Sequence, residues 1–446
     1  MQITHQEGPA SRGKLLRVLG VGFGLAVIIG NTIGAGIFRA PGEIAGHLPH
    51  AWLFLSVWIV GGLYALLGAV SIAELGAMLP RSGGQYVFSR YALGEYAGFI
   101  VGWSDWISTC GSTAAVALVI GEFSGALFPW FEGRAVAVAA FIVILFAVSQ
   151  WRGIVWGSNI QNVTSLLKAL AFVILIIAAF LLGGAKPSAP ANQAAVNVGL
   201  PLLAAFILAL QSVIYTYDGW TGVVYFSEEV ERPGRDIPRA LFGGVIAIIA
   251  IYLLVNLSLL YVLPVDKIAG QEFAVGAAAQ AIFGPYGDPI FRSLTIVSML
   301  STINALHLMG PRVLLAMSRD GLFSRRAAYV NTGGTPATAL LISTIVVVLF
   351  ILWGQTFSQV ITILAFFFVA NYALSFISLF VLRRREPNKE RPYRAWGYPW
   401  TTALALLGSI IFLMGAVASD TKNSVYALVL LGASYPVFRV TRLLAR

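Results

Sequence analysis

Two short stretches, each inside a long apolar segment, hold the residues best suited to bind a charged small molecule. The first is residues 30–38 (GNTIGAGIF), and the second is residues 215–220 (YTYDGW). Glycines and polar side chains are costly in a lipid-spanning helix, because the backbone groups that they free find no water there. Such backbone persists where it lines a cavity inside the protein, and matched breaks in two halves of a chain point to a ligand site.

The first break supplies both kinds of backbone group that a zwitterion needs. The helix that resumes near Gly36 begins with unpaired N–H groups, whose partial positive charge suits a carboxylate. Gly34, Ala35 and Gly36 carry almost no side chain, so a ligand can approach this backbone closely. The helix before the break leaves carbonyls near Thr32 and Ile33, which suit an ammonium group. Tight helix packing is the alternative, but these glycines are two residues apart, whereas the packing motif spaces them by four.

The second break adds carbonyls from Tyr215, Thr216 and Asp218, together with one side-chain carboxylate. Asp218 has three interpretations. It pairs with an amine or cationic side chain of the ligand, it accepts a proton, or it accepts hydrogen bonds from freed backbone N–H groups. Trp220 is expected to anchor the chain after the break and not to contact the ligand.

Lys168 lies inside the fifth apolar segment, between Leu167 and Ala169. A lysine at membrane depth costs at least about 2.5–3.5 kcal/mol and is therefore a functional residue by default. The alternative is that its ammonium group reaches back to the membrane surface. The sequence leaves open whether Lys168 is a fixed cation or a proton carrier.

The composition is that of a polytopic membrane protein. Of the 446 residues, 58% are hydrophobic and only 11% are charged, and the mean hydropathy is +0.82. Apolar runs of membrane-spanning length number roughly twelve and leave no room for a soluble domain. The net charge of +10 could indicate nucleic-acid binding, but the sequence contains no soluble domain that could carry a basic binding surface. No nucleotide-binding or hydrolase motif is present, so we expect no enzyme activity, no cofactor and no metal site.

The distribution of charge predicts the orientation. When the loops are assigned alternately, most Lys and Arg residues fall on one side, which the positive-inside rule makes cytoplasmic. Both termini are then cytoplasmic, and the expected location is the cell (inner) membrane. The polar lead 1–14 runs directly into a full-length span and does not resemble a cleavable signal peptide. Cys110 is the single cysteine and lies inside the third span.

The spacing of the breaks predicts an inverted repeat. From Gly34 to Gly219 is 185 residues, which contain five spans, so the second set of five enters the membrane from the opposite side. We expect one transmembrane domain over 1–446, with repeat one at 15–183 and repeat two at 200–382. Two further spans lie within 396–442.

Four motifs resemble the amino acid–polyamine–organocation superfamily, and in particular its L-type amino-acid transporter branch. They are the glycine break at 30–38, residues 80–94 (PRSGGQYVFSRYALG), residues 217–240 (YDGWTGVVYFSEEVERPGRDIPRA) and residues 304–321. The resemblance implies an all-α membrane protein with the LeuT fold: a 5+5 inverted repeat, discontinuous first and sixth helices, and two extra spans, twelve in all.

The resemblance also implies roles for single residues. Tyr215 matches an aromatic gate that closes over the substrate, although a packing tyrosine is the alternative. Lys168 matches a lysine that stands where sodium-coupled relatives bind an ion, and it would tie the first break to the fifth and eighth spans. Asp218 departs from the family pattern, in which a small residue is usual. The family's heavy subunit attaches through an exterior-loop cysteine that is absent here, so we expect no disulfide-linked heavy subunit.

Other polar residues have less specific expectations. Asp105 is expected to be hydrogen-bonded in the cytoplasmic vestibule, outside the central site. A cytoplasmic cluster after the second break is expected to be solvated, as a latch or as a plain charged loop; it comprises Glu228, Glu229, Arg232 and Arg235. The remaining candidates for the pocket wall are Ser108, Thr109, Ser112, Ser298, Ser301, Thr302, Asn304 and Asn371.

The predicted function is sodium-independent exchange or facilitated diffusion of small neutral L-amino acids by alternating access across the lipid bilayer. Proton-coupled symport is the alternative mechanism, and a cationic amino acid or polyamine is the alternative substrate. A channel would need a repeated polar ring along a pore, and a sensor would need a cytoplasmic domain; the sequence shows neither.

Overall fold

The computed structural model describes residues 15–183, 201–353 and 357–444, which are helical apart from turns and one isolated bridge. The N-terminal lead 1–14 and position 200, at the start of the predicted second repeat, lie outside these residues. The first half contains α1 (Val21–Thr32), α2 (Gly36–His47), α3 (Ala51–Met78), α4 (Gln85–Leu93), α5 (Glu95–Leu127), η1 (Pro129–Phe131), α6 (Ala135–Trp151) and α7 (Ile154–Leu182).

The second half begins with the second broken segment. It contains α8 (Leu202–Tyr217), η2 (Gly222–Phe226), α9 (Pro233–Val262), α10 (Val265–Ile268), α11 (Ala274–Phe283), η3 (Gly284–Tyr286), α12 (Gly287–Arg319), η4 (Arg325–Ala328), α13 (Ala337–Trp353) and α14 (Phe357–Arg385). The chain ends with α15 (Trp400–Ser419), α16 (Thr421–Gly432) and α17 (Ser434–Leu444). The division into two repeats remains a prediction.

The helices are long and apolar enough to make this a multi-pass membrane protein. Within the described ranges, nine helices are of membrane-spanning length and hydropathy, and the bent pair α1 and α2 makes a tenth. The shorter apolar helices α6 and α13 have 17 residues each, which is at the lower limit for a span. The all-helical fold is confirmed, while the count of about twelve spans stays a prediction.

Both predicted helix breaks are present. α1 ends at Thr32 and α2 begins at Gly36, with a bend of 42° between them. α8 ends at Tyr217, and the chain continues through turns into the short 3₁₀ segment η2. Gly219 lies in this turn with φ +107°, a conformation that favours glycine because it has no Cβ. The first and sixth spans are therefore discontinuous, as the sequence predicts.

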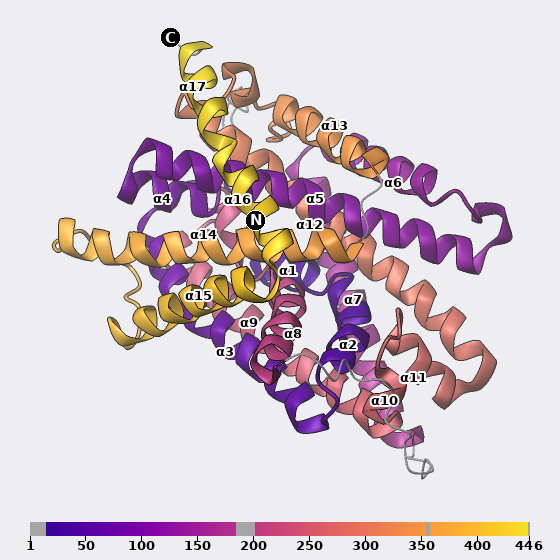
Figure 1. Ribbon diagram of the computed structural model, residues 1–446. Helices are drawn as coiled ribbons and strands as arrows, with labels where there is room; N and C mark the ends of the chain where they lie inside the picture. The colour runs from indigo at the N-terminus through magenta and orange to yellow at the C-terminus, as the bar shows by residue number, and fades with distance from the viewer. Residues whose placement is uncertain (1–14, 184–200, 354–356, 445–446) are drawn as a thin grey trace, which may run out of the picture.

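The two breaks contact each other through their glycines. A Cβ added to Gly36 would lie 2.6 Å from the hydroxyl oxygen of Thr216, and one added to Gly219 would lie 2.8 Å from Nδ2 of Asn31. In Figure 1 these segments lie in the middle of the helix bundle, and most residues of α1 are buried. Small residues thus let two backbone segments meet where larger side chains would separate them.

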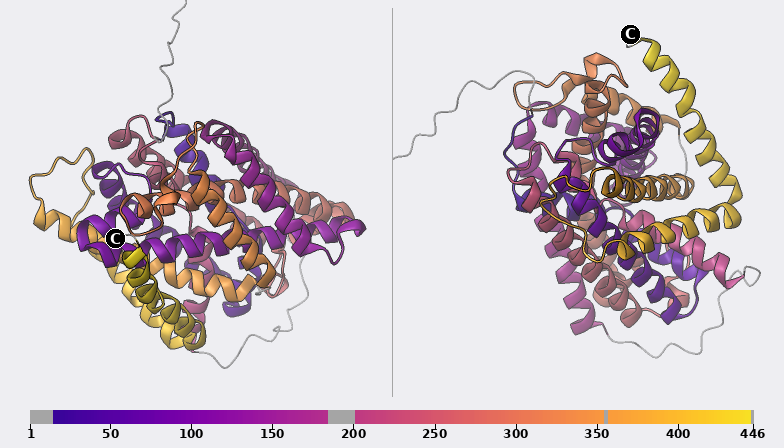
Figure 2. Two further views of the ribbon diagram at one scale, coloured as in Figure 1. Left: turned by 90° about the horizontal axis from the view of Figure 1, so that it is seen from above. Right: turned by 90° about the vertical axis from the view of Figure 1, so that its left-hand side faces the viewer.

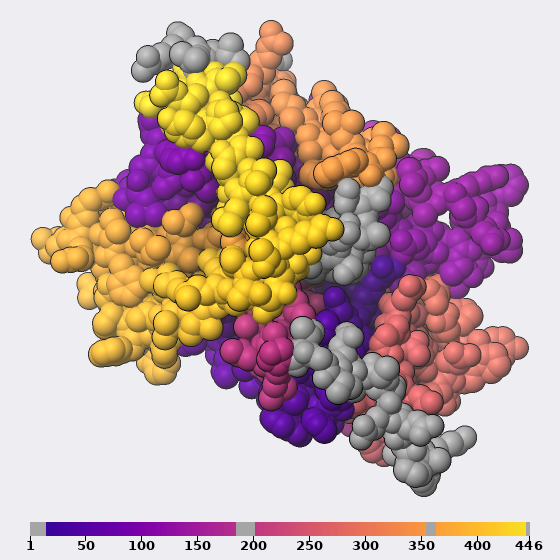
Figure 3. All heavy atoms as spheres, viewed as in Figure 1, coloured from indigo at the N-terminus to yellow at the C-terminus, as the bar shows by residue number. Residues whose placement is uncertain are grey.

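The C-terminal helices lie at the outside of this bundle. Figure 3 shows them across the face that is toward the viewer, and the right-hand view of Figure 2 places them along one edge. α15 packs on α3 and α14, with a hydrogen bond between Ser71 and Thr402 at 2.9 Å. They therefore support the bundle and do not form the meeting point of the breaks.

The charged cluster after the second break is not solvated as a whole, which corrects the sequence expectation. Glu229 is fully buried, and both of its carboxylate oxygens accept hydrogen bonds from Arg312 of α12, at 2.6 and 2.7 Å. The Glu229 carbonyl also accepts from the backbone N–H groups of Val18 and Leu19. The sequence could not show that a membrane-depth arginine and a strand-like N-terminal segment would enclose this carboxylate. Glu229 thus joins the segment before α1 and the chain after η2 to α12.

Candidate functional site

A small cavity of about 340 Å³ lies where the two breaks meet. Its wall combines the two breaks with one face each of α5 and α12. The lining residues are Asn31, Thr32, Gly34, Ala35, Gly36, Ser112, Val116, Tyr215, Thr216, Asp218, Thr302 and Leu306. All the predicted substrate-binding residues except Ile33 are among them.

The N-terminal end of α2 forms one side of the cavity. Its N-cap residue is Ala35, whose side chain offers no acceptor, and the first turn holds no acidic residue. The first N–H groups of a helix have no intrahelical partner and carry partial positive charge. Because Gly34 and Gly36 line the cavity at this point, an anionic group could approach these N–H groups directly.

Thr32 places a polar atom in the same wall. Thr32 is 3% exposed. Its hydroxyl oxygen is buried and has no hydrogen-bond partner in the described part of the chain. A buried polar atom without a partner costs about 1–3 kcal/mol. A ligand hydroxyl, carboxylate or ammonium group in the cavity would remove that cost.

Tyr215 and Asp218 form the wall on the side of the second break. Tyr215 is half-buried and its ring stacks on Phe368 of α14, with ring centroids 6.5 Å apart. The carboxylate of Asp218 accepts a hydrogen bond from the hydroxyl of Tyr372, also on α14. Trp220 is buried and packs on Tyr372; it does not line the cavity. α14 therefore supports the gate candidate and the acidic group together.

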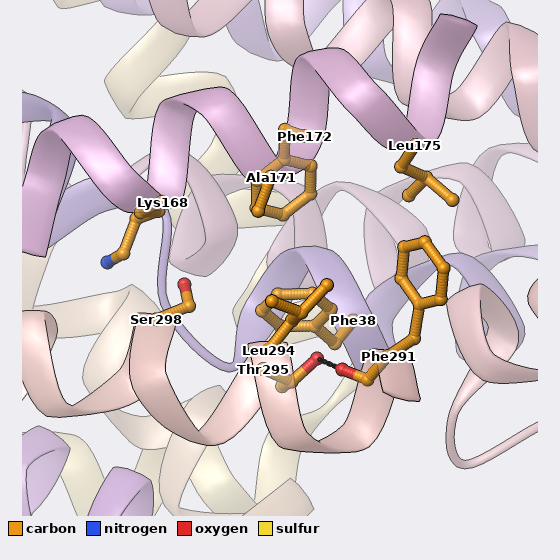
Figure 4. Close-up of a pocket in the computed structure, with 9 residues that line it drawn as sticks. All are labelled: Phe38, Lys168, Ala171, Phe172, Leu175, Phe291, Leu294, Thr295 and Ser298. Atoms are coloured by element: carbon orange, nitrogen blue, oxygen red, sulfur yellow. Dashed lines mark hydrogen bonds between the residues drawn. The ribbon is translucent and has the colours of Figure 1, made fainter. Parts of the chain in front are cut away.

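Lys168 of α7 is buried beneath the first break. Its ammonium group donates to the carbonyls of Gly30 at 2.8 Å and Ile33 at 2.5 Å, and to the hydroxyl of Thr302 at 3.0 Å. Figure 4 shows it pointing into the space between α7 and α12, at the polar end of a pocket that also includes Ser298. The side chain thus links α7, the first break and α12, and it does not reach back toward the membrane surface.

Three carbonyls that the sequence assigns to an ammonium group already have donors within the protein. The Ile33 carbonyl accepts from Lys168. The carbonyls of Thr32 and Thr216 both accept from the hydroxyl of Tyr252, on α9, at 2.7 and 2.9 Å. Asp218 is the acidic side chain among the residues that line this cavity.

A second polar cavity of about 310 Å³ adjoins the first and shares Asn31, Ser112 and Asp218 with it. Asp105 lines this second cavity, is 4% exposed, and accepts hydrogen bonds from the hydroxyl of Tyr225 at 2.8 and 2.9 Å. It is hydrogen-bonded and outside the first cavity, as expected. It is also nearer to that cavity than a vestibule position implies.

Of the other wall candidates, only Ser112 and Thr302 line the first cavity. Thr109 lines the second cavity, and Ser298 lies in the pocket beside Lys168. The side chain of Asn304 bonds to Gln161 and Gly157 and joins helices instead. Sequence reasoning missed Tyr225, Tyr252 and Tyr372, because a tyrosine inside an apolar segment gives no sign of where its hydroxyl points.

Comparison with known proteins agrees with this all-helical membrane fold. The chain matches the model of the amino acid permease family over residues 24–435 and belongs to that family, within the amino acid–polyamine–organocation superfamily.

Its relatives are amino-acid transporters. It is 28% identical to the serine/threonine exchanger SteT of Bacillus subtilis over 431 residues, which cover 95% of this chain and 96% of that protein. It is 27% identical to the human b(0,+)-type amino acid transporter 1, over 85% of this chain and 79% of that protein. It is 25% identical to the mouse Asc-type amino acid transporter 1, over 86% and 74% of the two chains.

Proposed function

We propose that this protein exchanges or facilitates the passage of small neutral L-amino acids, independently of sodium, by alternating access. The observation that carries the proposal is the cavity in which both helix breaks meet. The N-terminal end of α2 would hold the substrate carboxylate, and Asp218 would face the ammonium group. The unpartnered hydroxyl of Thr32 favours a small polar side chain, in keeping with a relative named as a serine/threonine exchanger.

The position of Lys168 supports the proposal of sodium independence. Its ammonium group is bound by two backbone carbonyls and one hydroxyl, which are hard oxygen ligands of the kind that metal cations bind. A positive charge fixed among these oxygens opposes the entry of a second cation. We therefore propose that Lys168 takes the place of a coupling ion.

The transport cycle would use the breaks as hinges. Tyr215 would act as the gate over the bound substrate, and tilting of the half-helices would open one side of the membrane at a time. We propose a location in the cell membrane with both termini in the cytoplasm. Because Cys110 is buried within α5, we propose that the chain works without a disulfide-linked heavy subunit.

The acidic groups support a second candidate function. Asp218 and Asp105 both line the second cavity, and neither has a cationic partner in the ion pairs of the described residues. A buried carboxylate without such a partner either binds a proton or attracts a cationic ligand. These observations favour proton-coupled symport, or a cationic amino acid or polyamine as substrate.

Uptake by proteoliposomes tests the proposal. Vesicles containing the purified protein and loaded with unlabelled serine should accumulate external labelled serine, and replacement of sodium by choline should leave the rate unchanged. Unloaded vesicles separate exchange from net uptake, and an inward pH gradient separates proton coupling from both. Competition with lysine or putrescine, if stronger than competition with alanine, would assign the cationic alternative. Absence of uptake with every amino acid tested would contradict the proposal.

A further inference from the structure

A group of buried polar side chains ties the middle of α1 to two other helices. Gln161 of α7 is fully buried, and its amide nitrogen donates to the Ala26 carbonyl at 3.2 Å and to the Ser165 hydroxyl at 2.9 Å. The Ser165 hydroxyl donates to the same carbonyl at 2.7 Å. Ser301 of α12 completes the group, with its hydroxyl oxygen 3.2 Å from both the Gln161 nitrogen and the Ser165 oxygen.

A glycine of α1 leaves room for this contact. A Cβ added to Gly30 would lie 1.8 Å from the amide nitrogen of Gln161 and 2.4 Å from the hydroxyl oxygen of Ser165. Any side chain at position 30 would therefore expel the amide from its place. Gly30 thus brings the backbone of α1 close enough for a neutral side chain of α7 to hold it.

The orientation of the Gln161 amide is fixed from its other side. Its oxygen accepts from the side-chain nitrogen of Asn304 at 2.9 Å, and the side-chain oxygen of Asn304 accepts from Gln150 of α6 at 2.9 Å. An amide whose oxygen is taken by a donor must turn its nitrogen the other way. A buried network with partners for each member holds one arrangement, and this one points the Gln161 donor at α1.

The two ties between α7 and α1 differ in strength. Lys168 binds the carbonyls of Gly30 and Ile33 near the end of α1 through a charged group, whereas the tie at Ala26 is neutral. Charged hydrogen bonds are roughly twice as strong as neutral ones. Ala26 lies four residues before Gly30, which is about 6 Å along the helix. A tilt of about 30° around the Lys168 attachment would move Ala26 by roughly 3 Å and break the neutral tie alone.

We infer that Gln161, with Ser165, is a positioning residue that latches α1 against α7 and must release it when the cytoplasmic side of the site opens. The inference rests on the proposed function, in which the half-helices tilt and α1 lies on the cytoplasmic side of its break. Neither Gln161 nor Ser165 lines the cavity between the breaks. They act through the backbone of α1, and their bonds set how often it is released.

The chain offers matched controls for both side chains. Ser158, also on α7, is 8% exposed, and its hydroxyl bonds to the Val155 carbonyl of its own helix. Gln150 belongs to the same amide network but bonds to Asn304 and not to α1. Ser158→Ala and Gln150→Met therefore remove the same groups as Ser165→Ala and Gln161→Met and leave the tie at Ala26 in place.

Thiol labelling of the purified protein without substrate tests the latch. Val27 of α1 is fully buried, so a cysteine introduced by Val27→Cys reacts with a charged maleimide when α1 is released. Gln161→Met should raise that rate about tenfold, which corresponds to about 1.4 kcal/mol, the size of one hydrogen bond. Ser165→Ala should raise it about fivefold and decides the question if Gln161→Met does not fold.

The two control variants should leave the labelling rate within about twofold of the parent, and equal rates in all four variants would overturn the inference. The parent with Cys110 alone, which is 1% exposed, gives the background. A cysteine introduced by Ile37→Cys separates release of α1 from general loosening, because Ile37 is fully buried in α2 beyond the break. Its rate should not change. An equal rise at positions 27 and 37 would show a loss of stability and reject the latch.

Exchange kinetics give a second readout that a purely structural role would not produce. A ligand binds only the molecules whose site faces it, so the ratio of the exterior KM to the cytoplasmic KM follows the ratio of the two populations. In oriented proteoliposomes, Gln161→Met should raise this ratio about tenfold, and Gln150→Met should not change it. An unchanged ratio in a transporting variant would reject the inference. If the wild type transports no amino acid, the proposed function fails, while the labelling experiment still decides the latch.

Discussion

The contact between Gly36 and Thr216 allows a sharp test of the substrate site. A Cβ at position 36 would lie 2.6 Å from the Thr216 hydroxyl oxygen and 2.9 Å from the Thr216 Cα. Carbon atoms pack at about 3.5–4.0 Å, so the two breaks must separate by roughly 0.5 Å or more. The Cα belongs to the backbone and cannot rotate away. Overpacking costs about 1–3 kcal/mol, and the helix preference of alanine returns at most about 1 kcal/mol.

We therefore predict that Gly36→Ala lowers the free energy of unfolding by no more than about 3 kcal/mol but weakens substrate binding at least about tenfold. Gly46, at the other end of α2, would have no neighbouring atom within 4 Å of an added Cβ and gives the matched control Gly46→Ala. Isothermal titration with serine on both purified variants measures the effect. Wild-type affinity in Gly36→Ala would refute the placement of the site between the breaks.

Three further predictions concern the charged groups around the site. Lys168→Met should abolish exchange, because the carbonyls of the first break lose its ammonium donor. Lys267→Met, at an exposed position of the short helix α10, should transport normally; comparable uptake rates in the two variants would remove the role of Lys168. Glu229→Gln should lower the free energy of unfolding by about 3–5 kcal/mol, because it leaves Arg312 buried without its counter-charge. An unchanged melting temperature would contradict this role of the Glu229–Arg312 pair. Asp218→Asn should weaken binding of all amino acids if the carboxylate holds the ammonium group, and weaken only cationic ones if it serves the side chain; wild-type affinity for both neutral and cationic amino acids would exclude either role.

Much of the site could be predicted because its signals are local. Glycines and polar residues inside apolar segments are conspicuous, and they marked both breaks before any three-dimensional information. Lys168 was predictable for the same reason, since a charge at membrane depth needs a partner. Its link to the first break came from the resemblance to the transporter superfamily and not from the lysine itself.

The remaining features depend on which segments meet in space. Tyr252 and Tyr372 read as ordinary packing residues, and only the fold shows that their hydroxyls reach Thr216 and Asp218. Glu229 reads as a solvated loop residue, and only the approach of Arg312 encloses it. Ile33 was expected to leave its carbonyl for the ligand, but Lys168 takes it. The local sequence shows that a buried polar or charged group needs a partner, but it does not show which residue that partner is.

A structure determined with bound serine tests the central claim most directly. Ligand density should lie in the cavity between the breaks, with the carboxylate against the N–H groups at the N-terminal end of α2 and the ammonium group toward Asp218. Lys168 should remain on the carbonyls of Gly30 and Ile33. Serine bound at any other place in the protein, with this cavity filled only by water, would contradict the account.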